Sequence, residues 1–119
     1  MQEEKSLSTS SAIAGETVYN LGSSQLIPPG EGRVYVVEGQ SVAVFRTRSG
    51  RVYAVQAECP HRGGPLIDGL VGDGKVICPL HSFAFDLTTG NPIENSCERL
   101  RSYSVALNAA GEILLTLVE

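Results

Sequence analysis

The chain has 119 residues, of which 42% are hydrophobic and 18% are charged. This length and balance indicate one globular domain, too small for a large substrate pocket beside a separate cofactor domain. Nine Lys and Arg against 13 Asp and Glu give a net charge of −4, which argues against a nucleic-acid-binding protein. No apolar run approaches the roughly 18 residues that a membrane-spanning helix needs, so we expect no membrane insertion.

The first part of the chain differs in composition from the rest. Residues 1–16 are rich in Ser, Glu, Lys and Thr and show no periodicity, so we expect a disordered tail there and one domain over residues 17–119. This tail has no basic stretch followed by an apolar core, and it therefore does not read as a secretory signal. Together with an odd number of cysteines, three in all, this predicts a cytoplasmic protein whose thiols are reduced or bind metal.

Short β-rich segments separated by glycine-containing turns follow this tail. The expected strands lie at residues 34–37, 42–45, 51–55, 75–77, 83–87, 103–107 and 113–118. Among them, residues 59–74 contain five glycines and two prolines, which predicts a loop rather than a helix or a long strand. No segment keeps a helical period over three turns. The pattern predicts an all-β sandwich or small barrel.

The chain has two histidines, and each lies beside a cysteine within such a loop. The two groups are Cys59-Pro60-His61 and Cys78-Pro79-Leu80-His81, which give the pattern C-x-H-x16-C-x2-H. Two proline-stiffened turns that face each other would offer two thiolates and two imidazoles to a metal centre. The sequence therefore predicts a metal site in the loops of about residues 57–92.

Several interpretations of this pattern are open. The four side chains could be ordinary core residues, or Cys59 and Cys78 could form a disulfide, which would explain neither histidine. They could also hold a structural zinc ion in an interaction module, although zinc sites usually pair Cys with Cys and His with His. In a [2Fe–2S] centre in which two histidines replace two cysteines on one iron, each loop donates one Cys and one His, and this arrangement accounts for the pairing.

The segments CPHRGGPL at 59–66 and CPLHSFAFDLTTG at 78–90 resemble the two cluster-binding boxes of Rieske iron–sulfur proteins. The resemblance implies one [2Fe–2S] cluster, with Cys59 and Cys78 on one iron and His61 and His81 on the other. It also implies the Rieske fold, in which three antiparallel sheets stack and a small sub-domain carries the cluster-binding loops.

Residues beside these ligands differ from those of the high-potential Rieske proteins of cytochrome bc complexes. Gly64 and Leu80 stand where those proteins carry two disulfide-bonded cysteines, and Phe83 and Phe85 stand where they carry hydroxyl donors to the cluster. Because fewer donors destabilise the more negative reduced cluster, we expect a low reduction potential. Cys97 lies beyond both boxes and is expected to be a free thiol.

Over residues 34–117 the chain is similar to the small subunit of NAD(P)H-dependent nitrite reductase. The shared features within this range include VAVFRTRSGRVYAVQ at 42–56 and DGLVGDGKVICPLH at 68–81, and IPPGEGR at 27–33, just before it, is shared as well. It implies a one-electron carrier that is not catalytic alone and serves the large reductase subunit. The alternative is a separate Rieske ferredoxin that supplies a ring-hydroxylating dioxygenase or another oxygenase. Either carrier needs a redox partner protein, and the absence of a GxGxxG or P-loop motif argues against nucleotide binding by this chain.

Overall fold

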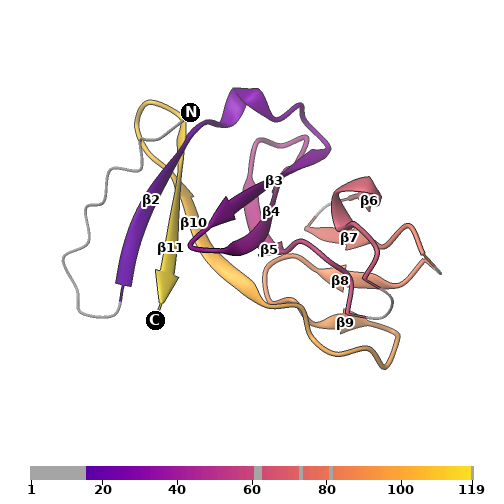
Figure 1. Cartoon of the computed structure of the whole chain (residues 1–119). Helices are drawn as coiled ribbons and strands as arrows, with labels where there is room; N and C mark the ends of the chain where they lie inside the picture. Colours follow the sequence, from indigo (N-terminus) through magenta and orange to yellow (C-terminus); the bar gives the residue numbers. More distant parts are fainter. Residues whose placement is uncertain (1–15, 61–62, 73, 81, 119) are drawn as a thin grey trace.

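The computed structural model describes residues 16–60, 63–72, 74–80 and 82–118. Within these residues the strands form two antiparallel sheets (Figure 1), a six-stranded sheet in the order β2-β11-β10-β5-β4-β3 and a four-stranded sheet in the order β6-β7-β8-β9. The large sheet contains β2 (Glu16–Ser23), β3 (Glu31–Val37), β4 (Gln40–Arg46), β5 (Val52–Gln56), β10 (Ser102–Leu107) and β11 (Glu112–Val118). The small sheet contains β6 (Leu70–Val71), β7 (Lys75–Ile77), β8 (Ala84–Asp86) and β9 (Pro92–Ile93).

The helical structure of the described residues consists of two short 3-10 turns. These are η1 (Ser24–Leu26), before β3, and η2 (Leu66–Asp68), before β6. The described part of the chain has no helix that is long and apolar enough to cross a membrane.

Strand β4 shows how the core is arranged, because both of its faces are buried. Val42 and Val44 point to one side and Ala43 and Phe45 to the other, and none of the four has exposed surface. A strand with two buried faces must lie between two other layers. Val42 and Val44 pack with residues of β2 and β11, whereas Ala43 and Phe45 pack against the small sheet.

The two cores are therefore separated by the middle layer of strands β3, β4 and β5. The core on the side of β2 and β11 contains Tyr19, Ile27, Val37, Val42, Val44, Ala54, Ile113, Leu115 and Leu117. The core on the side of the small sheet contains Ala43, Phe45, Val55, Ala57, Cys59, Leu66, Val76, Cys78, Phe85, Leu87 and Leu100. Cys59 and Cys78 belong to the second core.

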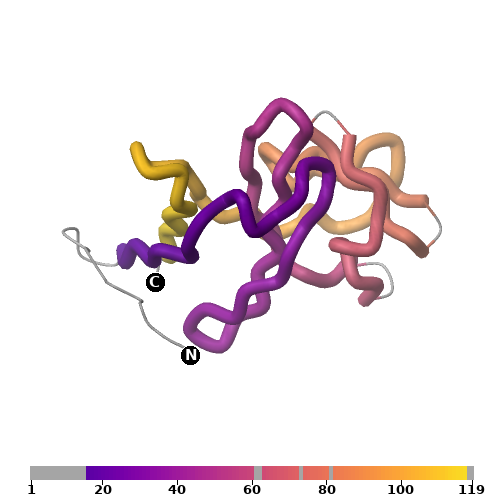
Figure 2. Tube along the Cα trace, turned by 90° about the horizontal axis from the view of Figure 1, so that it is seen from above, coloured from indigo at the N-terminus to yellow at the C-terminus, as the bar shows by residue number. Residues whose placement is uncertain are grey.

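Strand β10 joins two of the three layers. Its first residues, Ser102 and Tyr103, pair with β5, whereas Ser104 to Leu107 pair with β11. The large sheet consequently curls, with β2 and β11 at one end of the molecule and the small sheet at the other (Figures 1 and 2). The three stacked sheets implied by the family resemblance are thus present as three layers built from two sheets, since two layers share β10.

The turn between β3 and β4 has a backbone that fixes this hairpin. Glu38 and Gly39 have φ values of 54° and 77°, and two successive positive φ values are typical of the type I′ turn that suits the twist of paired strands. The Tyr19 hydroxyl of β2 donates a hydrogen bond to the Glu38 carboxylate. This contact ties the hairpin turn to the layer that contains β2 and β11.

The structure confirms the all-β class and places strands at each of the seven expected regions. It adds β2, β6 and β9, which the sequence did not indicate. β2 has weak alternation because Tyr19 is the one fully buried residue among its eight, and β6 and β9 are two residues long. The expectation of a disordered tail concerns residues 1–15, which lie outside the described residues, and Glu16, which begins β2.

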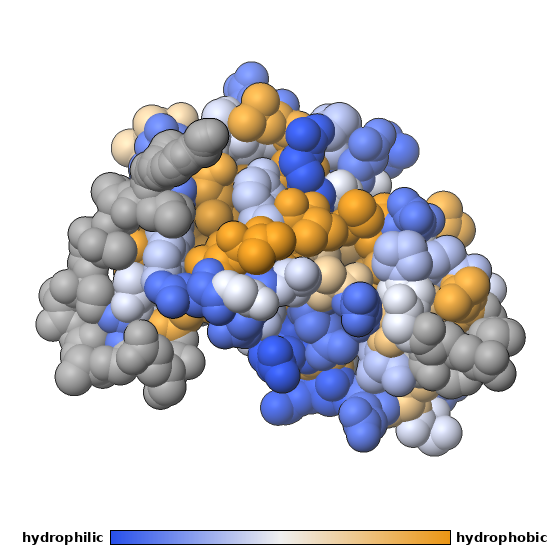
Figure 3. Space-filling view, in the orientation of Figure 1, coloured by the Kyte–Doolittle hydropathy of each residue, from blue (hydrophilic) through white to orange (hydrophobic). Residues whose placement is uncertain are grey.

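Strand β3 is an edge of the large sheet and keeps an apolar outer face. Val34 is 39% exposed and Val36 is 71% exposed. Figure 3 shows the apolar surface as a band across the middle of this face of the molecule. Val34 lies on the same side of the middle layer as the small sheet, since it pairs with Ala43 of that core.

Candidate metal centre

The first predicted box forms a closed turn at the exit of β5. The Cys59 N–H donates to the Gly64 carbonyl at 2.8 Å, and the Gly63 N–H donates to the Cys59 carbonyl at 2.7 Å. Gly63 has a φ of 71°, a left-handed conformation that glycine adopts without strain. Below the turn, the Leu66 N–H donates to the Ala57 carbonyl at 3.0 Å. These bonds hold Cys59 at the base of the turn, where it is 2% exposed.

The second box forms a similar turn between β7 and β8. The Cys78 N–H donates to the Phe83 carbonyl at 2.7 Å, and the Leu80 N–H donates to the Cys78 Sγ at 3.4 Å. Ser82 has a φ of 58°, which is costly for a residue with a Cβ atom. Cys78 is 1% exposed. Both boxes therefore place a buried sulfur at the start of a hydrogen-bonded turn.

The two buried thiols are close neighbours. Burial raises the pKa of the Cys78 thiol, and although the Leu80 N–H opposes this, the Cys59 thiol, a hydrogen-bond partner, raises the pKa further. In the protein alone the Cys78 thiol consequently favours its protonated form. Metal binding would displace the protons and convert the cysteines to thiolates, as metal centres of this kind require.

The surroundings of the thiols fit a metal cluster. A Cβ atom at Gly64 would lie 2.9 Å from the Leu80 Cδ1 and 3.5 Å from the Cys78 Sγ, so glycine is what lets the first turn approach the second. The Leu80 N–H already points to the Cys78 sulfur, and such a bond stabilises an iron-bound thiolate. Two of the four predicted ligands, the sulfurs of Cys59 and Cys78, are therefore described, one in each turn.

The other two predicted ligands, His61 and His81, lie outside the described residues, so their positions stay a prediction. Each turn is closed by a hydrogen bond between described residues, Cys59 with Gly64 in the first and Cys78 with Phe83 in the second. Among the described residues, no three Cys, His, Asp or Glu side chains gather closely enough to hold a metal ion. The assignment of His61 and His81 to a metal at the two thiols rests on the sequence pattern.

A third thiol lies near the pair. Cys97 is half-buried and free, and its N–H donates to the Asn95 Oδ1 at 3.0 Å. The Asn95 amide in turn donates to the carbonyls of Ala84 and Ile93, which fastens this segment to the small sheet. Burial raises the pKa of the Cys97 thiol, and the nearby Cys59 adds to this rise. The expected free thiol is confirmed, but its nearness to Cys59 could not be seen from the spacing.

The two phenylalanines of the second box, Phe83 and Phe85, line the apolar side of the site. Phe85 has no exposed surface, and Phe83 packs against the same core. Neither ring carries a hydroxyl group that could donate to a cysteine sulfur. The low reduction potential that follows from this difference stays a prediction.

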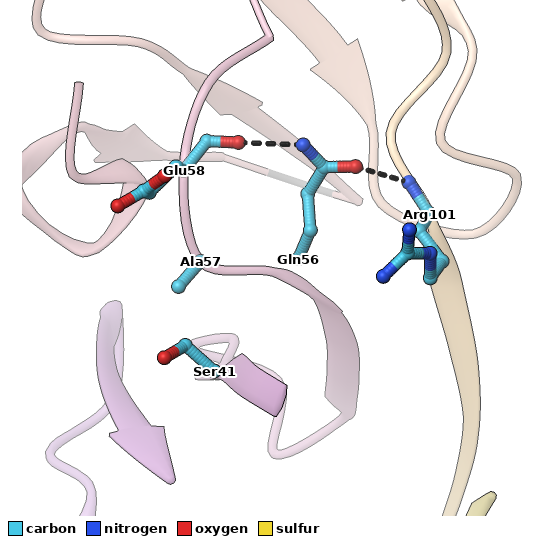
Figure 4. Close-up of a pocket in the computed structure, with 5 residues that line it drawn as sticks. All are labelled: Ser41, Gln56, Ala57, Glu58 and Arg101. Carbon is cyan, nitrogen blue, oxygen red and sulfur yellow. Dashed lines mark hydrogen bonds between the residues drawn. The ribbon is translucent and has the colours of Figure 1, made fainter. Parts of the chain in front are cut away.

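A small cavity of about 270 Å³ lies beside the first turn, lined by Ser41, Gln56, Ala57, Glu58 and Arg101 (Figure 4). The Gln56 Nε2 donates to the Glu58 carbonyl at 2.7 Å, and the Gln56 Oε1 accepts from the Arg101 N–H at 2.7 Å. Gln56 thus bridges the residue before Cys59 and the start of β10. No sequence signal singled out Gln56, because its partner Arg101 is 45 residues away.

Comparisons with known proteins identify the family of the chain. Residues 17–104 match the Rieske [2Fe-2S] domain family. A solved structure named as the NADH-dependent nitrite reductase small subunit from Mycobacterium tuberculosis has a TM-score of 0.80 at 25% identity, over 87% of this chain and 97% of that one. The ferredoxin of carbazole 1,9a-dioxygenase from Nocardioides aromaticivorans has a TM-score of 0.74 at 30% identity, over 82% of this chain and 95% of that one.

Larger enzymes are similar to this chain over one part of their length. Cholesterol 7-desaturase from Xenopus laevis is 42% identical over 69 residues, which are 56% of this chain and 15% of that protein. The chain thus spans about 15% of the length of this curated relative and matches one part of it. The family match covers most of the sequence. The chain therefore belongs to the Rieske [2Fe-2S] domain family, whose members are electron-transfer domains with a Rieske-type [2Fe–2S] cluster.

Proposed function

We propose that Cys59, His61, Cys78 and His81 bind a single [2Fe–2S] cluster and that the protein carries one electron at a time to a partner protein. The observation that carries this proposal is the pair of buried neighbouring thiols, each at the start of a closed turn with a histidine in its sequence. When bound, the cluster supplies reversible one-electron chemistry.

The chain has two tasks in this proposal, which are to shield the sulfurs and to leave a route for the electron. Cys59 and Cys78 are almost fully buried in the core under the small sheet, so water is excluded from that side. Leu80, between Cys78 and His81 in the sequence, is 39% exposed. A partner that docks against Leu80 would approach the ligand-bearing turns directly, which shortens the distance that the electron must cross.

The partner that we favour is the large subunit of a cytoplasmic NAD(P)H-dependent nitrite reductase. This choice is supported by the likeness to the small subunit from Mycobacterium tuberculosis over 97% of that chain. The second candidate is an oxygenase, because the ferredoxin of carbazole 1,9a-dioxygenase is 30% identical over a similar span. In both cases the chain is an electron-transfer component and catalysis takes place in the partner.

Charge also bears on the kind of partner. Around Cys59 and Cys97 the exposed Glu58, Glu94 and Glu98 lie beside the exposed Arg99 and Arg101, so the case for an acidic protein rests on the whole chain. The whole chain has a net charge of −4. We therefore propose that the partner presents a basic surface, and that the rate of association falls as ionic strength rises.

The ligand set can be tested by single substitutions. Cys59→Ser, His61→Ala, Cys78→Ser and His81→Ala should each lose the visible absorption and most of the bound iron and sulfide. Cys97→Ser is the matched control, because Cys97 is a neighbouring thiol outside the proposed set, and it should keep both. Any of the four variants with an unchanged spectrum and full iron would contradict the assignment, and a colourless wild-type protein with stoichiometric zinc would favour the zinc-stabilised interaction module.

The partner can be tested by rapid mixing of the reduced protein with each candidate acceptor. We expect fast oxidation by the large nitrite reductase subunit and slower oxidation at high salt. Leu80→Asn should lower the rate, and because it adds no charge beside the cluster, the reduction potential should change little. Fast oxidation by an oxygenase and none by the reductase subunit would instead identify a ferredoxin of the oxygenase type.

A further inference from the structure

The peptide group that leads into Cys59 is held at both of its ends. Its carbonyl, which belongs to Glu58, accepts a hydrogen bond from the Gln56 Nε2 at 2.7 Å. Its N–H, which belongs to Cys59, donates to the Gly64 carbonyl at 2.8 Å. A peptide group is planar, so fixing both ends fixes the rotation of the whole unit. The Cys59 carbonyl also accepts from the Gly63 N–H at 2.7 Å. Because the peptide groups on both sides of the Cys59 Cα are held, the direction in which the Cys59 side chain leaves the backbone is held as well.

The same glutamine reaches across to the strand that follows Cys97. Its Oε1 accepts from the Arg101 N–H at 2.7 Å, and its own backbone N–H donates to the Arg101 carbonyl at 2.8 Å. Figure 4 shows the side chain of Gln56 lying between Glu58 and Arg101. The amide therefore uses its donor for the first box and its acceptor for β10.

This bridge connects two segments that approach the thiol pair from different directions. Arg101 follows Leu100, which is fully buried and donates its N–H to the Gly90 carbonyl at 2.7 Å. Residues 94–101 are thus fastened to the small sheet at one end and to Gln56 at the other. Hydrogen bonds linked in series polarise one another, so the Gln56 amide and the Glu58–Cys59 peptide form one connected unit.

We infer that Gln56 is a positioning residue for the metal centre: its amide orients the Glu58–Cys59 peptide, and with it the Cys59 sulfur, against the segment that carries Cys97. This inference rests on the proposed role of Cys59 as a ligand. Gln56 does not touch the metal in this account. Its effect passes through the peptide group that precedes the ligand, and the conformational freedom of that peptide is what the amide removes.

Two substitutions separate the hydrogen bonds of Gln56 from its packing. Gln56→Met keeps an unbranched side chain of similar length and removes both side-chain bonds. Gln56→Glu keeps an acceptor for the Arg101 N–H but, when ionised, has no donor for the Glu58 carbonyl. The matched control is Gln40→Met, because the Gln40 Oε1 accepts from the Tyr103 hydroxyl at 2.9 Å on the same sheet without contact to either box.

The test measures electron paramagnetic resonance of the reduced proteins and the rate at which an iron chelator removes the cluster. In Gln56→Met and Gln56→Glu we expect broadened g features and a roughly 2- to 10-fold faster cluster loss, the size of one net hydrogen bond. Gln40→Met should match the wild type in both measurements. Equal behaviour of Gln56→Met and Gln40→Met would overturn the inference, and a wild-type spectrum in Gln56→Glu would overturn the role of the donor.

A second readout keeps this inference separate from the proposed function. In the metal-free protein, hydrogen exchange at the Cys59 amide should be faster in Gln56→Met than in Gln40→Met, because the clamped peptide is released. Equal exchange there would count against the clamp itself. If the wild-type protein gives no signal typical of mixed Cys and His ligation, the proposed ligand set fails, and that failure is visible before any variant is compared.

Discussion

The two sheets of this protein are held together in different ways. Strands of the large sheet are five to eight residues long, and both faces of β4 are buried. Strands of the small sheet are two or three residues long, and short strands of that kind are barely stable without other support. The small sheet draws its order from the turns at Cys59 and Cys78, from packing on Ala43 and Phe45 and, in our proposal, from the cluster.

This difference suggests a division of labour between the sheets. We propose that the large sheet is a hydrophobic platform that folds without the metal, and that the small sheet is a set of turns that presents ligands on that platform. A site built on rigid strands holds its geometry better than one on free loops. Each substitution below separates the stability of the platform from the order of the turns.

The largest effect is expected from Cys78→Ser. Loss of the ligand removes the metal and leaves the buried polar hydroxyl beside Cys59, so the small sheet should lose hydrogen-exchange protection. Amides of β4 and β11, which belong to the platform, should stay protected. Hydrogen exchange followed by mass spectrometry resolves the two regions, with Cys97→Ser as the control. Simultaneous loss of protection in both sheets would show that they do not differ as described.

Gly69→Ala should be the most damaging change within the small sheet that leaves all ligands in place. A Cβ atom there would lie 2.0 Å from the Ile77 carbonyl oxygen, which forces the backbone beside Cys78 to move and costs about 3 kcal/mol. Gly72→Ala is the matched control, because its nearest atom is the Lys75 Cγ at 3.8 Å. Chemical unfolding of both variants measures the difference; equal stabilities would show that the Gly69 approach is not needed.

Within the platform, Tyr35→Phe should stabilise the protein. The Tyr35 hydroxyl is buried and has no hydrogen-bond partner among the described residues, and burial raises its pKa. Removing an unsatisfied buried hydroxyl is expected to raise the free energy of unfolding by about 1 kcal/mol. Thermal unfolding measures this gain, and the visible spectrum should not change. A clear loss of stability would mean that the hydroxyl has a partner in solution.

The smallest effect is expected on the stability of the large sheet at low pH. Hydrogen bonds from the Asn108 and Asn20 amides hold the pKa of the Glu112 carboxyl below its usual value of 4.5. Because the folded-state pKa is the lower one, this stability is present above pH 4.5 and is lost as the pH falls through the folded-state pKa. Glu112→Gln should therefore flatten the pH dependence of unfolding below about pH 4.5. Urea unfolding at a series of pH values tests this, and an unchanged slope would contradict it.

The large sheet and the ligand boxes could be predicted from the sequence for different reasons. Strands β3, β4, β5, β10 and β11 show dense β-branched and apolar residues between turn signals, which local rules detect. The boxes were found because a metal centre imposes ligand types at short spacing. The short strands β6 and β9 were not predicted because two residues carry no periodicity. Strand β2 was not predicted because Tyr19 is its one buried residue.

The features that the sequence did not show depend on contacts between distant residues. The bond from the Arg101 N–H to the Gln56 side chain spans 45 residues, and the nearness of Cys97 to Cys59 arises from the path of residues 94–101 around the small sheet. Neither follows from a motif or a local propensity. These contacts bear on how the ligands are held rather than on which residues they are, which is why the ligand set could be proposed without them.

The central claim is that the two turns together bind one cluster through two cysteines and two histidines. Electron paramagnetic resonance of the dithionite-reduced, anaerobically purified protein tests it most directly. We expect a signal whose average g value lies well below that of a [2Fe–2S] cluster with four cysteine ligands. A signal with the g values of an all-cysteine cluster, or a colourless protein without a signal, would contradict the claim.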